Sequence, residues 1–181
     1  MERTNGPWTI QESSPKYQND FIEVVEDRVI QPDGRPGHYA TVSQKPGVAV
    51  LPVDGEGTAY LTRQFRYAVG RESLEVASGG IDAGEEPRAA AQREVREELG
   101  IEAGEWLDLG EIDLDTSIVR CPVFLFLARN LSFREAKREG TEAMETVRLP
   151  FAEAVRRVFD GSIRHAASCV LILKARESLG M

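Results

Sequence analysis

The distribution of apolar and polar residues along the chain first predicts a series of short β-strands. These segments are rich in β-branched and other apolar residues, and Gly, Pro, Asp or Asn residues separate them. A hairpin turn at residues 54–57 is expected to join two of them. Strands are predicted within residues 8–45 (21–30 most clearly) and at 47–53, 59–65, 72–78, 106–113, 121–128 and 145–150.

Three further segments carry helical periodicity instead. They are residues 87–99, 151–160 and 166–180. Pro87 suits the first position of the first helix, and Gly100 suits its C-terminal cap. Ala91, Val95 and Leu99 recur at a spacing of four on this helix, so their stripe is expected to face the core. Strands mixed with helices at the middle and end of the chain indicate an α/β or α+β layered domain.

A second stripe of the same helix is acidic. Glu94, Glu97 and Glu98 stand at positions i, i+3 and i+4, where like charges repel by roughly 0.3 kcal/mol per pair. Helix stability does not call for this arrangement, whereas Mg²⁺ and Mn²⁺ prefer carboxylate oxygens and water as ligands. The stripe therefore indicates a divalent cation site. The alternative is a solvated helix face on which Arg93 and Arg96 offset the repulsion.

Length, composition and charge narrow the class of protein. The chain has 181 residues, 41% hydrophobic and 29% charged, which fits a single globular domain. No apolar run is long enough to cross a bilayer and residues 1–20 lack a signal-peptide pattern, so we expect a cytoplasmic protein. A formal net charge of −8 disfavours binding to nucleic acid or to an anionic membrane. A phosphate-containing substrate would therefore need local arginines or a metal ion.

A spaced pattern of fixed residues overlaps the acidic helix. Gly79 is followed after five residues by Glu85, and after seven more by the run REVREELGI at residues 93–101. Every fixed position agrees with the Nudix box, G-x5-E-x7-R-E-U-x-E-E-x-G-U with U apolar, so the segment resembles that box in full. The resemblance implies an α/β protein, a Nudix α/β/α sandwich with a mixed β-sheet. It also implies a hydrolase that cleaves a nucleoside diphosphate linked to another group.

The same resemblance implies roles for residues of the box. Glu94, Glu97 and Glu98 would bind Mg²⁺ or Mn²⁺, and Glu97 and Glu98 would also be catalytic. The backbone carbonyl of Ser78 would be a further metal ligand. The metal would neutralise the diphosphate and lower the pKa of a bound water. Glu85 and Arg93 would have a structural role as an ion pair. Gly79 and Gly100 would have structural roles through their backbone conformation.

The stretch TRQFRYAVGRESLEVASGG at residues 62–80 resembles the ADP-ribose pyrophosphatase branch of the family, and the similarity extends over about residues 8–178. In that branch Arg66 would contact the diphosphate or its ribose, Glu75 would lie near the site, and Arg63 is a weaker candidate. The alternative for both arginines is a strand-edge charge with an outward ion pair.

The chain departs from that branch in two places. It has Ala77-Ser78-Gly79 where Pro-Ala-Gly is common, and Pro122 comes too late to match a proline often found after the box. ADP-ribose, GDP-mannose and other nucleoside diphosphate sugars therefore all stay open as substrates.

A further glutamate is expected in the segment before the strand at 145–150. The resemblance implies that this residue acts as a metal ligand or as the general base, which must reach the attacking water. Glu142 fits best by its spacing to the strand, Glu139 comes second, and Glu145 is expected within the strand itself. The alternative is a mobile charged loop without a role in catalysis.

The N-terminal residues 1–45 are expected to form a separate antiparallel β-sheet subdomain, and residues 46–181 the Nudix domain. In the branch that the chain resembles, the N-terminal sheet packs across a two-fold axis, which implies a homodimer. Trp8 would stack on a base or pack in that interface. His165 is expected to cap the last helix or to lie on the surface.

Two classes of protein are compatible with this sequence. One is a metal-dependent pyrophosphohydrolase that releases a nucleoside monophosphate and a sugar phosphate. The other is a Nudix-fold module that binds a nucleotide without cleaving it. Such modules tend to lose glutamates of the box, and this chain keeps Glu94, Glu97 and Glu98, so the sequence favours the enzyme.

Overall fold

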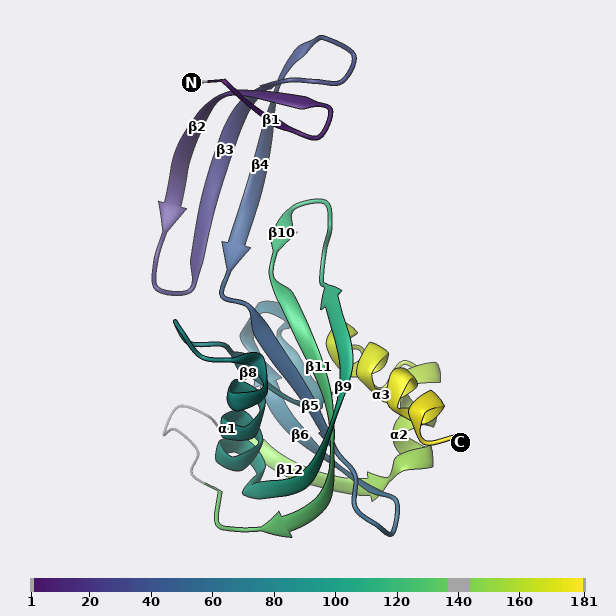
Figure 1. The fold of residues 1–181 in the computed structure, drawn as a ribbon. Helices are drawn as coiled ribbons and strands as arrows, with labels where there is room; N and C mark the ends of the chain where they lie inside the picture. Colours follow the sequence, from purple (N-terminus) through teal and green to yellow (C-terminus); the bar gives the residue numbers. More distant parts are fainter. Residues whose placement is uncertain (1, 137–143, 181) are drawn as a thin grey trace. The chain divides into compact units, whose positions relative to one another are not determined.

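The chain divides into two compact units. In the computed structural model, which describes residues 2–136 and 144–180, one unit comprises Met1–Lys45 and Asp113–Cys121, and the other Pro46–Ile112 and Pro122–Met181. Figure 1 shows the course of the chain through both units. The contribution of residues 113–121 to the first unit is not indicated by the sequence, because it depends on a strand pairing between distant segments.

The first unit is a β-sheet in the order β1-β2-β3-β4-β10. Neighbouring strands run antiparallel except β4 and β10, which are parallel, with Val42 opposite Val119. Ile10 of β2 lies opposite Val29 of β3, and both side chains are buried in this unit. The bounds are β1 Arg3–Asn5, β2 Trp8–Gln18, β3 Ile22–Ile30, β4 Pro36–Gln44 and β10 Val119–Arg120.

The second unit contains two sheets, in the orders β8-β5-β11-β9 and β12-β6-β7. Strands β5 and β11 are parallel while β5 and β8 are antiparallel, so the first of these sheets is mixed. The first sheet is built from β5 Gly47–Pro52, β8 Ala77–Gly80, β9 Ile101–Asp113 and β11 Pro122–Phe133. The second is built from β6 Thr58–Arg66, β7 Arg71–Glu75 and β12 Met144–Pro150.

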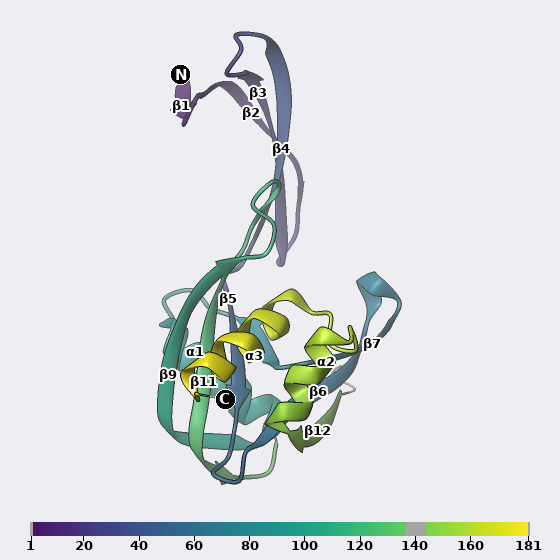
Figure 2. The same cartoon turned by 90° about the vertical axis from the view of Figure 1, so that its right-hand side faces the viewer.

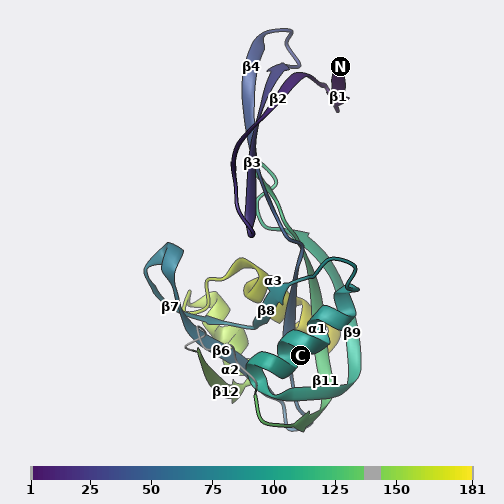
Figure 3. The same ribbon diagram turned by 90° about the vertical axis from the view of Figure 1, so that its left-hand side faces the viewer.

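Helices cover both sides of the second unit. Figure 2 shows α3 and α2 in front of the strands, and the opposite view in Figure 3 brings α1 to the front. Helix α1 contacts β8 and β5, whereas α3 contacts β5 and β11. The predicted α/β/α sandwich with a mixed sheet is therefore confirmed. The helices are α1 Pro87–Leu99, α2 Phe151–Phe159 and α3 Ala166–Ser178, and a short 3₁₀ turn covers Tyr67–Val69.

Helix α1 has the limits that its sequence predicts. Pro87 occupies the first turn, and Gly100 ends the helix with φ of 66°, donating its N–H to the carbonyls of Arg96 and Val95. Ala91 and Val95 are fully buried and Leu99 is 7% exposed, so the predicted core stripe is confirmed. These side chains pack with the buried face of β5 and β11, which fixes the orientation of the neighbouring acidic stripe.

Two sequence-based boundaries are wrong. The single strand predicted at 72–78 is two strands, because β7 pairs with β6 while β8 pairs with β5, and Val76 lies between them. The strand predicted at 106–113 begins at Ile101, directly after the helix cap. In both cases the pairing partner decides the limits, which local patterns do not contain. Within the described part of the chain, no helix has the length and apolar character needed to span a membrane.

Candidate active site

Strand β8 and helix α1 bring backbone and carboxylate into close contact at Gly79. A Cβ atom at this position would lie 2.0 Å from the Cδ atom of Glu94, which is far inside van der Waals contact. Only a residue without a side chain therefore leaves room for the Glu94 carboxylate, whose side chain is 14% exposed. The glycine at the start of the box is thus required by the placement of the first acidic residue of its helix.

Arg93 ties the loop before α1 to the helix. Its Nε donates to Oε1 of Glu85 at 3.0 Å, and its Nη2 donates to Oε2 of Glu85 and to the carbonyl of Gly80, both at 2.9 Å. Glu85 also accepts the N–H of Asp82 at 3.1 Å. The hydrogen bonds from Arg93 and Asp82 lower the pKa of the Glu85 carboxyl. The ion pair expected between Glu85 and Arg93 is present.

The three glutamates of the acidic stripe have different surroundings. Nη1 of Arg93 donates to Oε1 of Glu94 at 2.6 Å and to Oε2 of Glu97 at 3.4 Å. Glu98 is only 4% exposed, and its Oε2 accepts the backbone N–H of Ser78 at 3.2 Å. Two carboxylates therefore share one arginine, while the third is held against the strand that carries Ser78.

These residues have the chemistry that a hard divalent cation requires. Carboxylate oxygens from one helix face strand β8 at Gly79, where no side chain occupies the space, and Mg²⁺ and Mn²⁺ prefer such oxygen ligands. Within residues 2–136 and 144–180, no three His, Cys, Asp or Glu side chains are grouped closely enough to form a ready metal site. Because Arg93 lies between Glu94 and Glu97, a bound cation would have to take over the contacts that Arg93 makes with them.

A second arginine–glutamate pair joins the last residue of β6 to the last residue of β7 along the antiparallel hairpin. Nε of Arg66 lies 3.1 and 3.2 Å from the two carboxylate oxygens of Glu75, and its Nη2 lies 2.5 Å from Oε2. The Glu75 side chain is 3% exposed. Burial alone would raise the pKa of this carboxyl, but the hydrogen bonds from Arg66 and Ser73 outweigh burial and lower it. Arg66 therefore forms an ion pair, as the alternative for it expected, but its partner is a buried carboxylate.

Arg63 differs from Arg66 although both lie on β6. It forms an ion pair with Glu145 at 3.1 Å, and the two side chains are 41% and 67% exposed. Glu145 lies within β12, as expected. Glu139 and Glu142 lie outside the described residues, so the glutamate sought in this segment stays a prediction.

Helix α3 adds two residues to this region that the sequence did not indicate. The Ser168 hydroxyl, fully buried, accepts the N–H of Val76 at 3.0 Å and lies 2.9 Å from Nδ1 of His165. The same Nδ1 lies 3.5 Å from Oε2 of Glu75. His165 occupies the N-cap position, as expected, but without a side-chain cap hydrogen bond. The spacing of three residues is the only signal in the sequence that places both side chains on one helix face.

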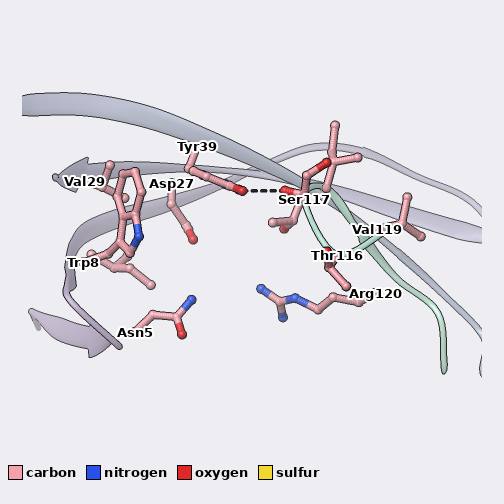
Figure 4. A pocket seen from close by; sticks show the side chains of 12 residues that line it. Asn5, Trp8, Asp27, Val29, Tyr39, Thr116, Ser117, Val119 and Arg120 are labelled. Atoms are coloured by element: carbon pink, nitrogen blue, oxygen red, sulfur yellow. Dashed lines mark hydrogen bonds between the residues drawn. The ribbon is translucent and has the colours of Figure 1, made fainter. Parts of the chain in front are cut away.

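The first unit contains a pocket of about 240 Å³ beside Trp8 (Figure 4). The Trp8 and Tyr39 rings meet edge to face with centroids 5.4 Å apart, and the Tyr39 hydroxyl donates to the Ser117 carbonyl at 2.5 Å. The side chains of Asp27 and Arg120 both point into this pocket. The pocket therefore combines an aromatic wall with groups of both charges. Stacking of Trp8 on a base stays a prediction.

Comparisons with known proteins agree with this architecture. The NUDIX domain family matches residues 43–166. An ADP-ribose pyrophosphatase of Bacillus subtilis is 29% identical over 167 residues, or 90% of each chain. A GDP-mannose pyrophosphatase of Klebsiella pneumoniae is 33% identical over 124 residues, covering 64% of this chain and 62% of that protein. The crystal structure of an ADP compounds hydrolase has the same fold, with a TM-score of 0.83, 22% identity, and coverage of 96% of this chain and 94% of that one.

The family match covers more than half of the chain and includes the whole pattern at residues 79–101. The chain therefore belongs to the Nudix family. It is a Nudix hydrolase, similar over most of its length to an ADP-ribose pyrophosphatase. Nudix hydrolases generally depend on a divalent metal, which agrees with the oxygen-rich residues around Gly79.

Proposed function

We propose that this protein is a Mg²⁺-dependent pyrophosphohydrolase, with Mn²⁺ as an alternative metal, that acts on ADP-ribose or a related nucleoside diphosphate sugar. Its products would be a nucleoside monophosphate and a sugar phosphate. The observation that carries the proposal is the complete box, folded so that Glu94 lies against Gly79 and Glu98 against Ser78. Similarity to an ADP-ribose pyrophosphatase along 90% of the chain supports the substrate class.

Glu94, Glu97 and Glu98, with the Ser78 carbonyl, would hold the metal. When bound, the metal would stabilise negative charge on the diphosphate and lower the pKa of a coordinated water. Glu97 and Glu98 would orient the reacting groups. Arg93 would keep its bidentate contact with Glu85, which fixes the loop, and would release Glu94 and Glu97 to the cation.

Arg66 would contact the diphosphate or its ribose, and Glu75 would hold the Arg66 guanidinium in place. Arg63 would serve as a weaker, exposed contact that gives up its pair with Glu145. Glu142 is the proposed general base. Because a base must reach the attacking water directly or through one other molecule, this assignment depends on where substrate binding places residue 142.

GDP-mannose is the second candidate substrate, since a GDP-mannose pyrophosphatase is 33% identical to this chain. That similarity covers 64% of the chain, against 90% for the ADP-ribose pyrophosphatase. The difference favours ADP-ribose. A binding module that does not cleave its nucleotide is the third candidate, and intact Glu94, Glu97 and Glu98 argue against it.

The N-terminal unit would serve as the dimerisation element of a cytoplasmic homodimer. Tyr17 and Phe21 of this unit are 55% and 77% exposed, and contact with a second copy would remove them from water. The net charge of −8 argues against nucleic acid and anionic membranes as partners. Sedimentation of the wild-type protein and of Phe21→Glu should show a dimer and a monomer, respectively.

The experiment that tests the activity measures phosphate released by alkaline phosphatase after incubation with nucleotide sugars. The panel contains ADP-ribose, GDP-mannose, ADP-glucose and UDP-glucose, each with Mg²⁺, Mn²⁺ or EDTA. Metal-dependent hydrolysis strongest on ADP-ribose supports the proposal. If GDP-mannose is hydrolysed most strongly, the second candidate substrate replaces ADP-ribose in the proposal. Nucleotide binding without any hydrolysis would refute the enzyme and favour the binding module.

A further inference from the structure

Four side chains from the start of helix α3 to the end of β6 are linked by hydrogen bonds and by an ion-pair contact between His165 and Glu75. Ser168 accepts the Val76 N–H and contacts Nδ1 of His165, and the same nitrogen lies 3.5 Å from the Glu75 carboxylate. Glu75 in turn holds Nε and Nη2 of Arg66. The series thus runs from a fully buried hydroxyl to a guanidinium that is 38% exposed.

The partners of His165 determine which of its ring nitrogens carries the proton. Nδ1 lies next to an ionised carboxylate and a hydroxyl, so a hydrogen on Nδ1 can be shared between Oε2 of Glu75 and Oγ of Ser168. A bare lone pair on Nδ1 would instead face the negative charge of Glu75. We therefore assign the neutral tautomer with the proton on Nδ1, which makes His165 a donor toward Glu75.

His165 adds a contact to Glu75 beside the hydrogen bonds from Arg66 and Ser73, and all of these groups meet a carboxylate that is buried. Only 3% of the Glu75 side chain is exposed, so water reaches it poorly and protein groups must satisfy its oxygens. Arg66 approaches from β6, and His165 approaches from α3. Contacts from these two elements prevent rotation of the carboxylate, and the carboxylate fixes the plane of the guanidinium.

We propose that His165 is a positioning residue for substrate binding, which acts through Glu75 to hold Arg66 in the orientation that receives the diphosphate or its ribose. The inference rests on the proposed function of Arg66. His165 does not touch the substrate and takes no part in the chemical step. Ser168 completes the arrangement, since its contact with the Val76 N–H anchors α3 to the strand that ends at Glu75.

The charged groups that face His165 give this role a pH dependence. They are Glu75 from β7 and Arg66 from β6, and burial together with Arg66 holds the pKa of His165 below its ordinary value of 6.5, against the opposing effect of Glu75. A proton taken up by His165 places a second positive charge beside Arg66 and competes for the same carboxylate. Substrate binding should therefore weaken as pH falls below about 6.5, while the chemical step is unaffected by this group.

The test compares two substitutions at His165 with a matched substitution at the other histidine of the chain. His165→Ala removes the donor, whereas His165→Asn keeps a polar group near the position of Nδ1. His38, whose side chain is 65% exposed in the first unit, provides His38→Asn as the control. For each protein, kcat and KM are measured on the substrate found for the wild type between pH 5 and pH 9, and the melting temperature is recorded.

The expected result is a rise in KM of about tenfold for His165→Ala, with kcat changed less than about threefold. His165→Asn should restore KM to within about threefold of wild type, and both variants should lose the acidic ionisation in kcat/KM. His38→Asn should behave as the wild type in every measurement. An unchanged KM in His165→Ala, or a lower melting temperature as its only defect, would overturn the role.

An incorrect proposed function would be recognised by a different experimental outcome. If the wild type hydrolyses no nucleotide sugar, calorimetry with ADP-ribose replaces the kinetic assay. A weaker Kd in His165→Ala that His165→Asn restores then supports the positioning role in a binding protein. If the wild-type protein neither cleaves nor binds ADP-ribose or GDP-mannose, the proposed role of Arg66 is wrong. This inference, which rests on that role, is then overturned as well.

Discussion

Two arginine–glutamate pairs stabilise the candidate active site, and they differ in the surroundings of the carboxylate. In the box pair, Arg93 joins helix α1 to the preceding loop through Glu85 and also contacts Glu94 and Glu97. In the hairpin pair, Arg66 joins the ends of β6 and β7 through Glu75, which is buried. Arg93, 25% exposed, is shared among several carboxylates, whereas Glu75, 3% exposed, is contacted by side chains from several elements. The hairpin pair therefore involves a distant helix and the box pair does not.

The two pairs also differ in what they are expected to control. The box pair fixes the residues proposed to bind the metal, so changes around it should reduce kcat. The hairpin pair fixes a residue proposed to bind substrate, so changes there should raise KM. Mutations in each region can separate these effects.

The largest effect is expected for Glu98→Gln on the box side. The substitution removes the charge of a proposed metal ligand but keeps its shape and its capacity to accept the Ser78 N–H. We expect kcat to fall by roughly 10²–10³-fold with the melting temperature nearly unchanged. Steady-state kinetics at saturating Mg²⁺ and thermal unfolding check both parts. Turnover close to wild type would exclude Glu98 as a ligand.

A somewhat smaller loss is expected for Gly79→Ala. The added methyl group would meet the Glu94 carboxylate, whose Cδ lies 2.0 Å from the Cβ position, and would displace it. Displacement of this size should lower kcat/KM by about 10²-fold. Gly55→Ala is the matched control, because nothing lies within 4 Å of its Cβ position. Equal activity of the two variants would show that Glu94 tolerates movement.

The direct comparison of the two pairs uses Glu75→Gln and Glu85→Gln. In the hairpin pair the buried glutamine cannot satisfy Arg66 as a carboxylate does, so we expect KM to rise and stability to fall by about 2 kcal/mol. In the box pair we expect a change in stability within about 1 kcal/mol, because the Glu85 side chain is more exposed than that of Glu75. Urea unfolding and kinetics of both variants provide the measurement. A larger stability loss in Glu85→Gln would reverse the comparison.

The smallest effect is a pH dependence of stability, of which only the decrease that begins near pH 6.5 is specific to the hairpin region. The pKa of His165 lies below its ordinary 6.5 in the folded protein, so the unfolded chain takes up a proton first as pH falls, and stability begins to decrease below pH 6.5. A second decrease follows below about 4.5, the ordinary pKa of Glu75 and Glu85, because both carboxyl pKa values are lowered by folding. Urea unfolding from pH 8 to pH 4 should show both decreases, and His165→Asn should lack the first. Stability that rises between pH 6.5 and 5 would contradict this assignment.

The sequence predicted the box region well because its signals are local. Pro87 and Gly100 mark the ends of α1, and the spacing of Ala91, Val95 and Leu99 identifies its buried face. The Glu85–Arg93 pair follows from a pattern contained in one stretch of chain. The sandwich architecture followed from the resemblance that this pattern carries.

The hairpin region was predicted less completely because long-range packing decides it. The break between β7 and β8 at Val76 depends on two different partner strands. The contact of His165 with Glu75 exists only after α3 has packed on the sheet, and a histidine before an apolar helix carries no local sign of it. Arg66 was indicated as a candidate, but the burial of its partner was not.

The parallel pairing of β4 with β10 affects how the protein can be made. Val42 pairs with Val119, and Ser43 with Arg120, so the N-terminal sheet needs a strand from much later in the chain. During synthesis this sheet cannot be completed when residues 1–45 have left the ribosome, because its last strand is translated only after residues 46–112 of the second unit. A shortened protein that ends before residue 119 would therefore expose the β4 edge, which makes incomplete chains prone to aggregation.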